Sequence, residues 1–165
     1  ICLKRYTAQN IVIGGAAGAF PPMIGWLSMT GTISFMPIFM FVLIFFWTPP
    51  HFWSLALIKS DDYEKVKIPM MPNIAGSFST RCQIIIYSVL VFLTAVSPIY
   101  LGYTGLVYSF ISIPLSTIFL IYSILILCMP NKKIEMQLFW FSIFYLFSIF
   151  MGLVLDDIII GVNVL

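Results

Sequence analysis

A pair of adjacent carboxylates, Asp61 and Asp62, stands in a segment that is otherwise rich in lysine. Neighbouring acids repel each other unless a cation is present, and Mg²⁺ is commonly bound by one or two carboxylates together with substrate phosphates. The cations that would hold such phosphates are Lys59, Lys65 and Lys67, with Lys4 and Arg5 near the start of the sequence. These residue types favour a site for Mg²⁺ and a diphosphate. The alternative is a solvated loop in which Asp61 and Lys65 form an ordinary i, i+4 helical pair.

The one histidine of the chain, His51, lies in an aromatic stretch with the sequence Trp47-Thr48-Pro49-Pro50-His51-Phe52-Trp53. If the helix that carries it continues to Asp61, a rise of 1.5 Å per residue places His51 about 15 Å deeper in the membrane. An ionisable side chain at that depth is a functional candidate, although a histidine can also be satisfied by a neighbouring carbonyl group. The aromatic residues fit either a wall that binds a ring or an interface belt. The stretch and the carboxylates together favour a lipid diphosphate, with its head at the interface and its chain in the bilayer.

The elements that must position these residues are apolar segments. Hydrophobic residues make up 61% of the 165 residues and charged residues 8%, whereas a soluble domain is about one quarter charged. Five segments have the length of about 20 residues that a membrane crossing needs, at approximately 10–29, 33–59, 81–101, 105–129 and 136–160. We therefore predict an all-α polytopic membrane helix bundle in the lipid bilayer, one domain over residues 1–165, with a functional loop at 60–80. A net charge of +2 gives no reason to expect a nucleic-acid partner.

The basic residues divide the two sides of the predicted bundle. With five crossings, every lysine and arginine falls on one side, which the positive-inside rule makes cytoplasmic. Asp156 and Asp157 fall near the opposite interface, where acids at a helix end need no functional explanation. A transporter would have ionisable groups near the midplane of the membrane, and among the ionisable residues His51 alone lies within a span away from its ends. Three scattered cysteines indicate neither a metal site nor a disulfide framework.

Longer motifs carry a family resemblance. The segments Leu3-Lys4-Arg5-x-Thr7-x-x-Asn10-Ile11-x-Ile13-Gly14-Gly15 and Gly18-Ala19-x-Pro21-Pro22-x-x-Gly25-Trp26 are followed by the aromatic stretch, Asp61-Asp62-Tyr63 and Pro69-Met70-Met71-Pro72. Together they resemble the protohaem IX farnesyltransferases, a family of UbiA-type intramembrane prenyltransferases. The resemblance covers about residues 3–72, and from Gly76 onward only the hydrophobic layout is similar.

The resemblance implies a fold of nine helices, of which this chain would hold the fifth to the ninth. It implies that farnesyl diphosphate and protohaem IX (haem B) are substrates, that Mg²⁺ assists the departure of diphosphate, and that the product is haem O, the precursor of haem A. A prenyltransferase acting on a quinone or a chlorophyll-type ring is one alternative. A haem-binding or transport module without chemistry is another.

The resemblance also assigns roles to residues. Asp61 and Asp62 match the second acidic motif, which would bind the metal and the diphosphate. Lys4 and Arg5 match a basic loop that would stabilise the leaving group, and Asn10 and Lys65 are further candidates for binding substrate. His51 matches a histidine that could ligate the haem iron or serve as a base. The superfamily often has a second aspartate four residues after the first, but this chain has Lys65 there.

The family's first acidic motif is not in this sequence, and we expect it upstream of Ile1, where residues are expected to be missing. Because a metal-bridged diphosphate would need carboxylates from both motifs, we expect this chain by itself to be inactive. The Asp-Asp-Tyr and Pro-Met-Met-Pro patterns favour a bacterial inner membrane over a mitochondrial one. The candidate partners are a haem A synthase and a second copy of the protein.

Overall fold

The computed structural model describes residues 10–65 and 70–160, without the side chains of residues 10, 61, 64, 65 and 160. Lys4 and Arg5, predicted to stabilise a leaving group, and Lys67 therefore lie outside the described residues. The elements are α1 (Asn10–Thr30), α2 (Phe35–Ile58), α3 (Ser60–Lys65), α4 (Met71–Ala75), α5 (Ser77–Tyr100), α6 (Leu106–Cys128) and α7 (Lys132–Ile160). The described residues contain no strand, which confirms the all-α prediction.

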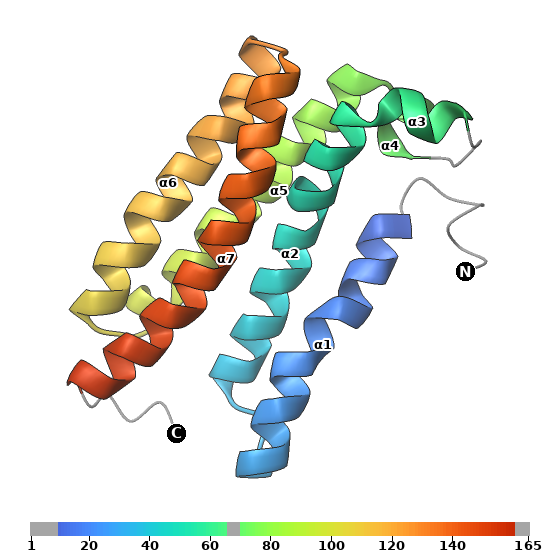
Figure 1. Ribbon diagram of the computed structural model, residues 1–165. Coiled ribbons are helices and arrows are strands. Elements are labelled where there is room, and N and C mark those ends of the chain that lie inside the picture. Colours follow the sequence, from blue (N-terminus) through green and yellow to red (C-terminus); the bar gives the residue numbers. More distant parts are fainter. Residues whose placement is uncertain (1–9, 66–69, 161–165) are drawn as a thin grey trace.

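Four of the long helices form a bundle with antiparallel neighbours (Figure 1). The helix α2 packs against α5 and α7, and α6 packs against the same two helices. The helix α1 lies outside this group and packs along α2. The short helices α3 and α4 lie together at one end of the bundle, beyond the end of α2.

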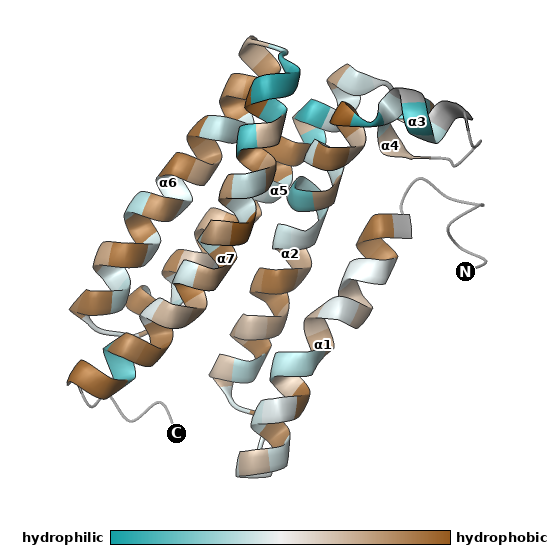
Figure 2. Cartoon of the chain, in the orientation of Figure 1, coloured by the Kyte–Doolittle hydropathy of each residue, from teal (hydrophilic) through white to brown (hydrophobic). Residues whose placement is uncertain are grey.

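The surface of the bundle is apolar, as a bilayer requires. Five helices are long and apolar enough to cross a membrane, and large side chains such as Phe110, which is 77% exposed, point outward from them. Hydrophilic residues gather toward the helix ends (Figure 2). These helices confirm the predicted polytopic bundle, so the chain is an integral membrane protein.

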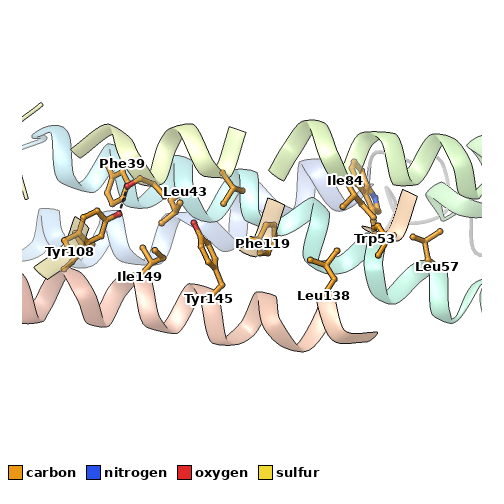
Figure 3. Packing of buried hydrophobic residues seen from close by; sticks show 14 of the residues in the cluster. Phe39, Leu43, Trp53, Leu57, Ile84, Tyr108, Phe119, Leu138, Tyr145 and Ile149 are labelled. Carbon is orange, nitrogen blue, oxygen red and sulfur yellow. Dashed lines mark hydrogen bonds between the residues drawn. The ribbon is translucent and has the colours of Figure 1, made fainter. Parts of the chain in front are cut away.

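The interior of the bundle is filled by aromatic and aliphatic side chains (Figure 3). Trp53, Tyr108, Phe119 and Tyr145 are among the largest fully buried residues. Hydroxyl groups in this interior form hydrogen bonds between α5 and α6. The Ser88 and Ser123 hydroxyl oxygens lie 2.7 Å apart, and the Tyr108 hydroxyl donates to the Ala95 carbonyl oxygen at 2.8 Å. Hydrogen bonds of this kind help hold helices together where lipid removes the hydrophobic drive for association.

A carboxylate ties α7 to α6 at the end remote from α3. The Asp156 side chain is 1% exposed, and it accepts hydrogen bonds from the backbone N–H groups of Gly105 and Tyr108, the latter at 3.0 Å. These groups belong to the N-terminus of α6, where N–H groups have no partner within the helix. The carboxylate also complements the positive end of the helix dipole. Asp156 is therefore a cap that α7 supplies to α6, whereas its place in the sequence predicts only a position near the interface.

An ion pair links α5 and α7 at the other end. A guanidinium nitrogen of Arg81 lies 2.9 Å from Glu135 Oε1, and the two side chains are 17% and 3% exposed. Glu135 was expected in a connecting loop, but α7 begins at Lys132, where Asn131 Oδ1 accepts from the Lys133 backbone N–H at 2.8 Å. In the same way α5 begins at Ser77, before the expected residue 81, directly after Gly76 with φ of +83°.

Candidate active site

An apolar cavity of about 780 Å³ lies between α1 and α2. Most of its wall consists of small and aliphatic residues of α1 and of larger residues of α2, and α3 and the residue before α4 complete it. The described residues that line it are Ile11, Ile13, Gly14, Gly15, Ala17 and Gly18; Ile44, Trp47, Thr48, Phe52 and Ala56; Tyr63; and Met70. A volume of this size fits a ligand of drug-like dimensions or a long hydrocarbon chain.

Glycine brings the two helices together at the side of the cavity. A Cβ atom on Gly15 would lie 2.9 Å from Thr48 Cγ2 and 3.1 Å from Thr48 Cβ, which is closer than two carbon atoms pack. The Thr48 side chain is fixed because its hydroxyl donates to the Ile44 carbonyl oxygen at 2.7 Å. The sequence therefore needs glycine at position 15 for α1 to lie at this distance from α2.

We expect Gly15→Ala to lower the free energy of unfolding, because α1 or Thr48 must move; overpacking of this kind costs about 1–3 kcal/mol. Gly25→Ala is the matched control on α1, since its added Cβ would have no described heavy atom within 4 Å apart from its chain neighbours and the nearby backbone of α1. Alanine favours a helix over glycine by about 1 kcal/mol. Unfolding in mixed detergent micelles compares the variants. Equal stability of the two would show that α1 does not depend on this close approach.

The carboxylate pair lies on the short helix α3. The depth of about 15 Å predicted for His51 requires one helix to run from His51 to Asp61. Instead, α2 ends at Ile58, and Lys59 leaves the helical conformation with φ of −103° and ψ of +19°. The Lys59 carbonyl oxygen then accepts from the backbone N–H groups of Asp62 and Tyr63, both at 3.1 Å. This turn starts a separate helix that lies beside the end of α2 (Figure 1).

One residue of α3 connects the acids to the cavity. Tyr63 lines the cavity, and the preceding side chain, Asp62, is exposed. The Asn73 amide of α4 donates to the Ser60 carbonyl oxygen at 3.1 Å, which ties α4 to the start of α3. The side chains of Asp61 and Lys65 are outside the described part, so their part in a site remains a prediction.

The described side chains include no group of three or more His, Cys, Asp and Glu residues that could hold a metal ion. Mg²⁺ bound by substrate phosphates keeps several waters and takes few protein carboxylates, so a site of this kind needs no such group. The exposed carboxylate of Asp62 beside the cavity residue Tyr63 fits that type of site. Metal binding by Asp61 and Asp62 stays a prediction.

His51 lies between α2 and α7 and is 9% exposed. Its ring stacks between Trp47, at a centroid distance of 4.4 Å, and Phe139, at 4.7 Å. Its Nδ1 atom lies 2.7 Å from the Ser142 hydroxyl oxygen. The Trp47 indole N–H donates to the Ser142 carbonyl oxygen at 2.9 Å, so a single residue of α7 contacts both rings.

The structure places His51 behind the cavity wall. Trp47 and Phe52 line the cavity, whereas His51 is not among the described lining residues. Both aromatic residues touch the His51 ring, since Phe52 meets it edge-on at a centroid distance of 5.1 Å. The aromatic stretch therefore serves as a wall on one side and as the surroundings of a histidine on the other.

Sequence reasoning missed the contribution of α7 to this site. Phe139 and Ser142 are three residues apart, on one face of that helix. The only local signal at Ser142 is a small polar residue inside an apolar helix, and α7 offers another at Ser148. Nothing in the sequence indicates which of these faces His51, because 91 positions separate Ser142 from it.

The structure is thus a membrane helix bundle with an apolar cavity, whose wall includes a residue of a short acidic helix. The comparison with known families is consistent with this. The chain belongs to the UbiA prenyltransferase family, whose sequence profile matches residues 1–152.

Individual relatives are similar over most of the chain. A protoheme IX farnesyltransferase of Rhizobium etli (strain CIAT 652) is 50% identical over 158 residues, covering 93% of this chain and 50% of the relative. One of Erythrobacter litoralis (strain HTCC2594) is 51% identical over 161 residues, covering 94% of this chain and 52% of the relative. The chain thus spans about half the length of the curated relatives that it matches. No solved structure matches the chain.

Proposed function

We propose that the protein transfers a farnesyl group from farnesyl diphosphate to a vinyl group of protohaem IX and so makes haem O. The observation that carries the proposal is the cavity of about 780 Å³, which runs along α1 and α2 and includes Tyr63 of the acidic helix in its wall. An apolar chain fits such a cavity, and its diphosphate would meet the carboxylates at the interface. The similarity to protoheme IX farnesyltransferases at about 50% identity supports the choice of substrates.

In the proposed reaction the bond from farnesyl C1 to diphosphate breaks, with the electron pair leaving on the diphosphate, and C1 joins the outer vinyl carbon of the porphyrin. The positive charge left on the inner vinyl carbon is quenched by a water molecule, which adds there as a hydroxyl group and gives up a proton. Asp61 and Asp62 would hold Mg²⁺, which when bound neutralises charge on the diphosphate. Cations oriented toward the leaving group stabilise the charge that develops there, a role that suits Lys4 and Arg5. Asn10 and Lys65 are proposed to bind substrate.

The proposed setting is a bacterial inner membrane with the acidic helix on the cytoplasmic side. The basic residues whose side chains the structure describes are Lys59, after the last residue of α2, Arg81, near the start of α5, and Lys132 and Lys133, at the start of α7. These helix ends lie at the end of the bundle that carries α3 (Figure 1). A cluster of lysine and arginine is typical of the cytoplasmic face. A haem A synthase or a second copy of the protein is a proposed partner.

The test is a product assay on the full-length protein in membranes, supplied with farnesyl diphosphate, protohaem IX and Mg²⁺. We expect a porphyrin product whose mass includes the farnesyl group, together with released diphosphate. Prenylation of a quinone or chlorophyll-type ring instead of haem would replace the proposed acceptor. Haem binding without loss of diphosphate would indicate a binding or transport module.

His51→Ala is expected to impair the acceptor step and to leave the affinity for farnesyl diphosphate unchanged. The proposed roles as iron ligand or base both concern the porphyrin, and His51 is not among the described residues that line the cavity proposed for the farnesyl chain. Loss of a general base typically costs about 10²-fold or more in rate. Steady-state kinetics with each substrate varied in turn measure the effect. A selective loss of farnesyl diphosphate affinity would contradict this assignment.

A further inference from the structure

We propose that Ser142 is a positioning residue, which holds the His51 ring with its proton on Nδ1 and leaves the lone pair on Nε2. The chemical use of that lone pair rests on the proposed function, whereas the position of the proton does not. Ser142 lies on α7 and reaches His51 on α2 across the bundle.

The first step concerns the single proton of the Ser142 hydroxyl. Its oxygen lies 2.6 Å from the Phe139 carbonyl oxygen. A carbonyl oxygen only accepts hydrogen bonds, so the Ser142 hydroxyl must be the donor in this pair. Having one proton, the hydroxyl has none left for His51 and takes part in the second contact as an acceptor.

The second step concerns the histidine. His51 Nδ1 lies 2.7 Å from the same hydroxyl oxygen, and an acceptor there requires an N–H group on Nδ1. A neutral imidazole carries one proton, and a proton on Nδ1 leaves Nε2 as an acceptor. The chain of bonds therefore runs from Nδ1–H through the hydroxyl to the carbonyl oxygen of Phe139.

The third step is that the ring cannot turn to exchange its nitrogens. It is stacked between Trp47 and Phe139, with planes 14° and 19° from its own. Trp47 in turn is fixed by its bond to the Ser142 carbonyl oxygen at 2.9 Å. A half-turn of the imidazole about its Cβ–Cγ bond would move Nδ1 away from the Ser142 hydroxyl and would break this hydrogen bond between α2 and α7.

An unprotonated Nε2 is the form that both proposed roles of His51 require. A metal ligand or a general base uses the lone pair of a neutral imidazole, and a hydrogen bond at the other nitrogen decides which one carries it. Ser142 would thereby act on the acceptor side of the reaction without touching the porphyrin.

Nitrogen NMR of the full-length protein labelled with ¹⁵N-histidine tests the tautomer directly, with the His51 signals identified by their loss in His51→Gln. At pH 8 and without substrates, we expect a proton on Nδ1 in the native protein. Ser142→Ala should give a mixture or the other tautomer, and Ser142→Thr, which keeps a hydroxyl, should restore the native pattern. Ser148→Ala is the matched control on α7 and should leave the His51 signals unchanged.

A native ring protonated on Nε2 would overturn the proposal, and so would a native-like spectrum of Ser142→Ala. The native measurement decides even if that variant fails to fold. Kinetic measurements then test the proposed function separately from the tautomer. Removing the hydrogen-bond partner of a functional histidine typically lowers activity by about 10–100-fold. Ser142→Ala should therefore reduce turnover with protohaem by that factor and leave the affinity for farnesyl diphosphate unchanged. The predicted tautomer together with no haem farnesylation in the native protein would retain the proton assignment and reject the reaction.

Discussion

Turnover should be lost in the full-length protein when alanine replaces either Asp61 or Asp62. These acids belong to the short helix that contributes Tyr63 to the cavity wall, where they are proposed to hold the metal that neutralises the departing diphosphate. Removing one electrostatic group that acts on developing charge typically costs about 10²–10³-fold in rate. Insertion into the membrane should be unaffected, because α3 lies outside the long apolar helices.

The measurement is the rate of diphosphate release with saturating protohaem, at several concentrations of Mg²⁺. Asp157→Ala is the matched control. It removes a carboxylate near the end of α7, at the side of the bundle remote from α3, and should leave the rate unchanged. Raised Mg²⁺ should partly restore a variant whose only defect is weaker metal binding. Normal turnover in both Asp61→Ala and Asp62→Ala would show that the metal site lies elsewhere.

The largest effect on stability is expected at Asp156. Alanine there would leave two backbone N–H groups of α6, on Gly105 and Tyr108, without the partner that the carboxylate provides. Hydrogen bonds that involve a charged group contribute about 1.5–3 kcal/mol each, while bonds between membrane helices average nearer about 0.6 kcal/mol. Weighing both, we expect Asp156→Ala to lower the free energy of unfolding by about 2–4 kcal/mol.

Its neighbour provides the control for this prediction as well. Asp157 is less buried than Asp156, so Asp157→Ala should change the free energy of unfolding by less than about 0.5 kcal/mol. Unfolding in mixed micelles, followed by circular dichroism, compares the two variants. If they are equally stable, the cap on α6 contributes nothing that water or lipid headgroups cannot replace.

The helices could be predicted from the sequence because their signal is local. A run of about 20 apolar residues must form a helix in lipid, where every backbone polar group needs a partner. The predicted starts of two helices were less accurate. The helix α5 begins at Ser77 and α7 begins at Lys132, in both cases before the apolar run begins. Polar residues can form the first turn of a membrane helix, so hydropathy alone places these boundaries too late.

The site was predictable only where a motif was contiguous. Tyr63, in the segment with Asp61 and Asp62, does line the cavity, but the break after Ile58 was missed because Lys59 carries no strong helix-ending signal such as glycine or proline. Contacts between distant helices left no trace in the sequence. Ser142 meets His51 only because α7 packs beside α2, and apolar periodicity does not determine which helices become neighbours.

The place of α1 outside the four-helix bundle bears on how the protein can evolve. Of the bundle helices it packs chiefly along α2, yet it supplies nearly half of the described cavity residues. Substitutions at exposed positions of α1 can therefore reshape the cavity while the packing of α2, α5, α6 and α7 stays intact. The shape of the cavity and the stability of the four-helix bundle can therefore change independently of each other.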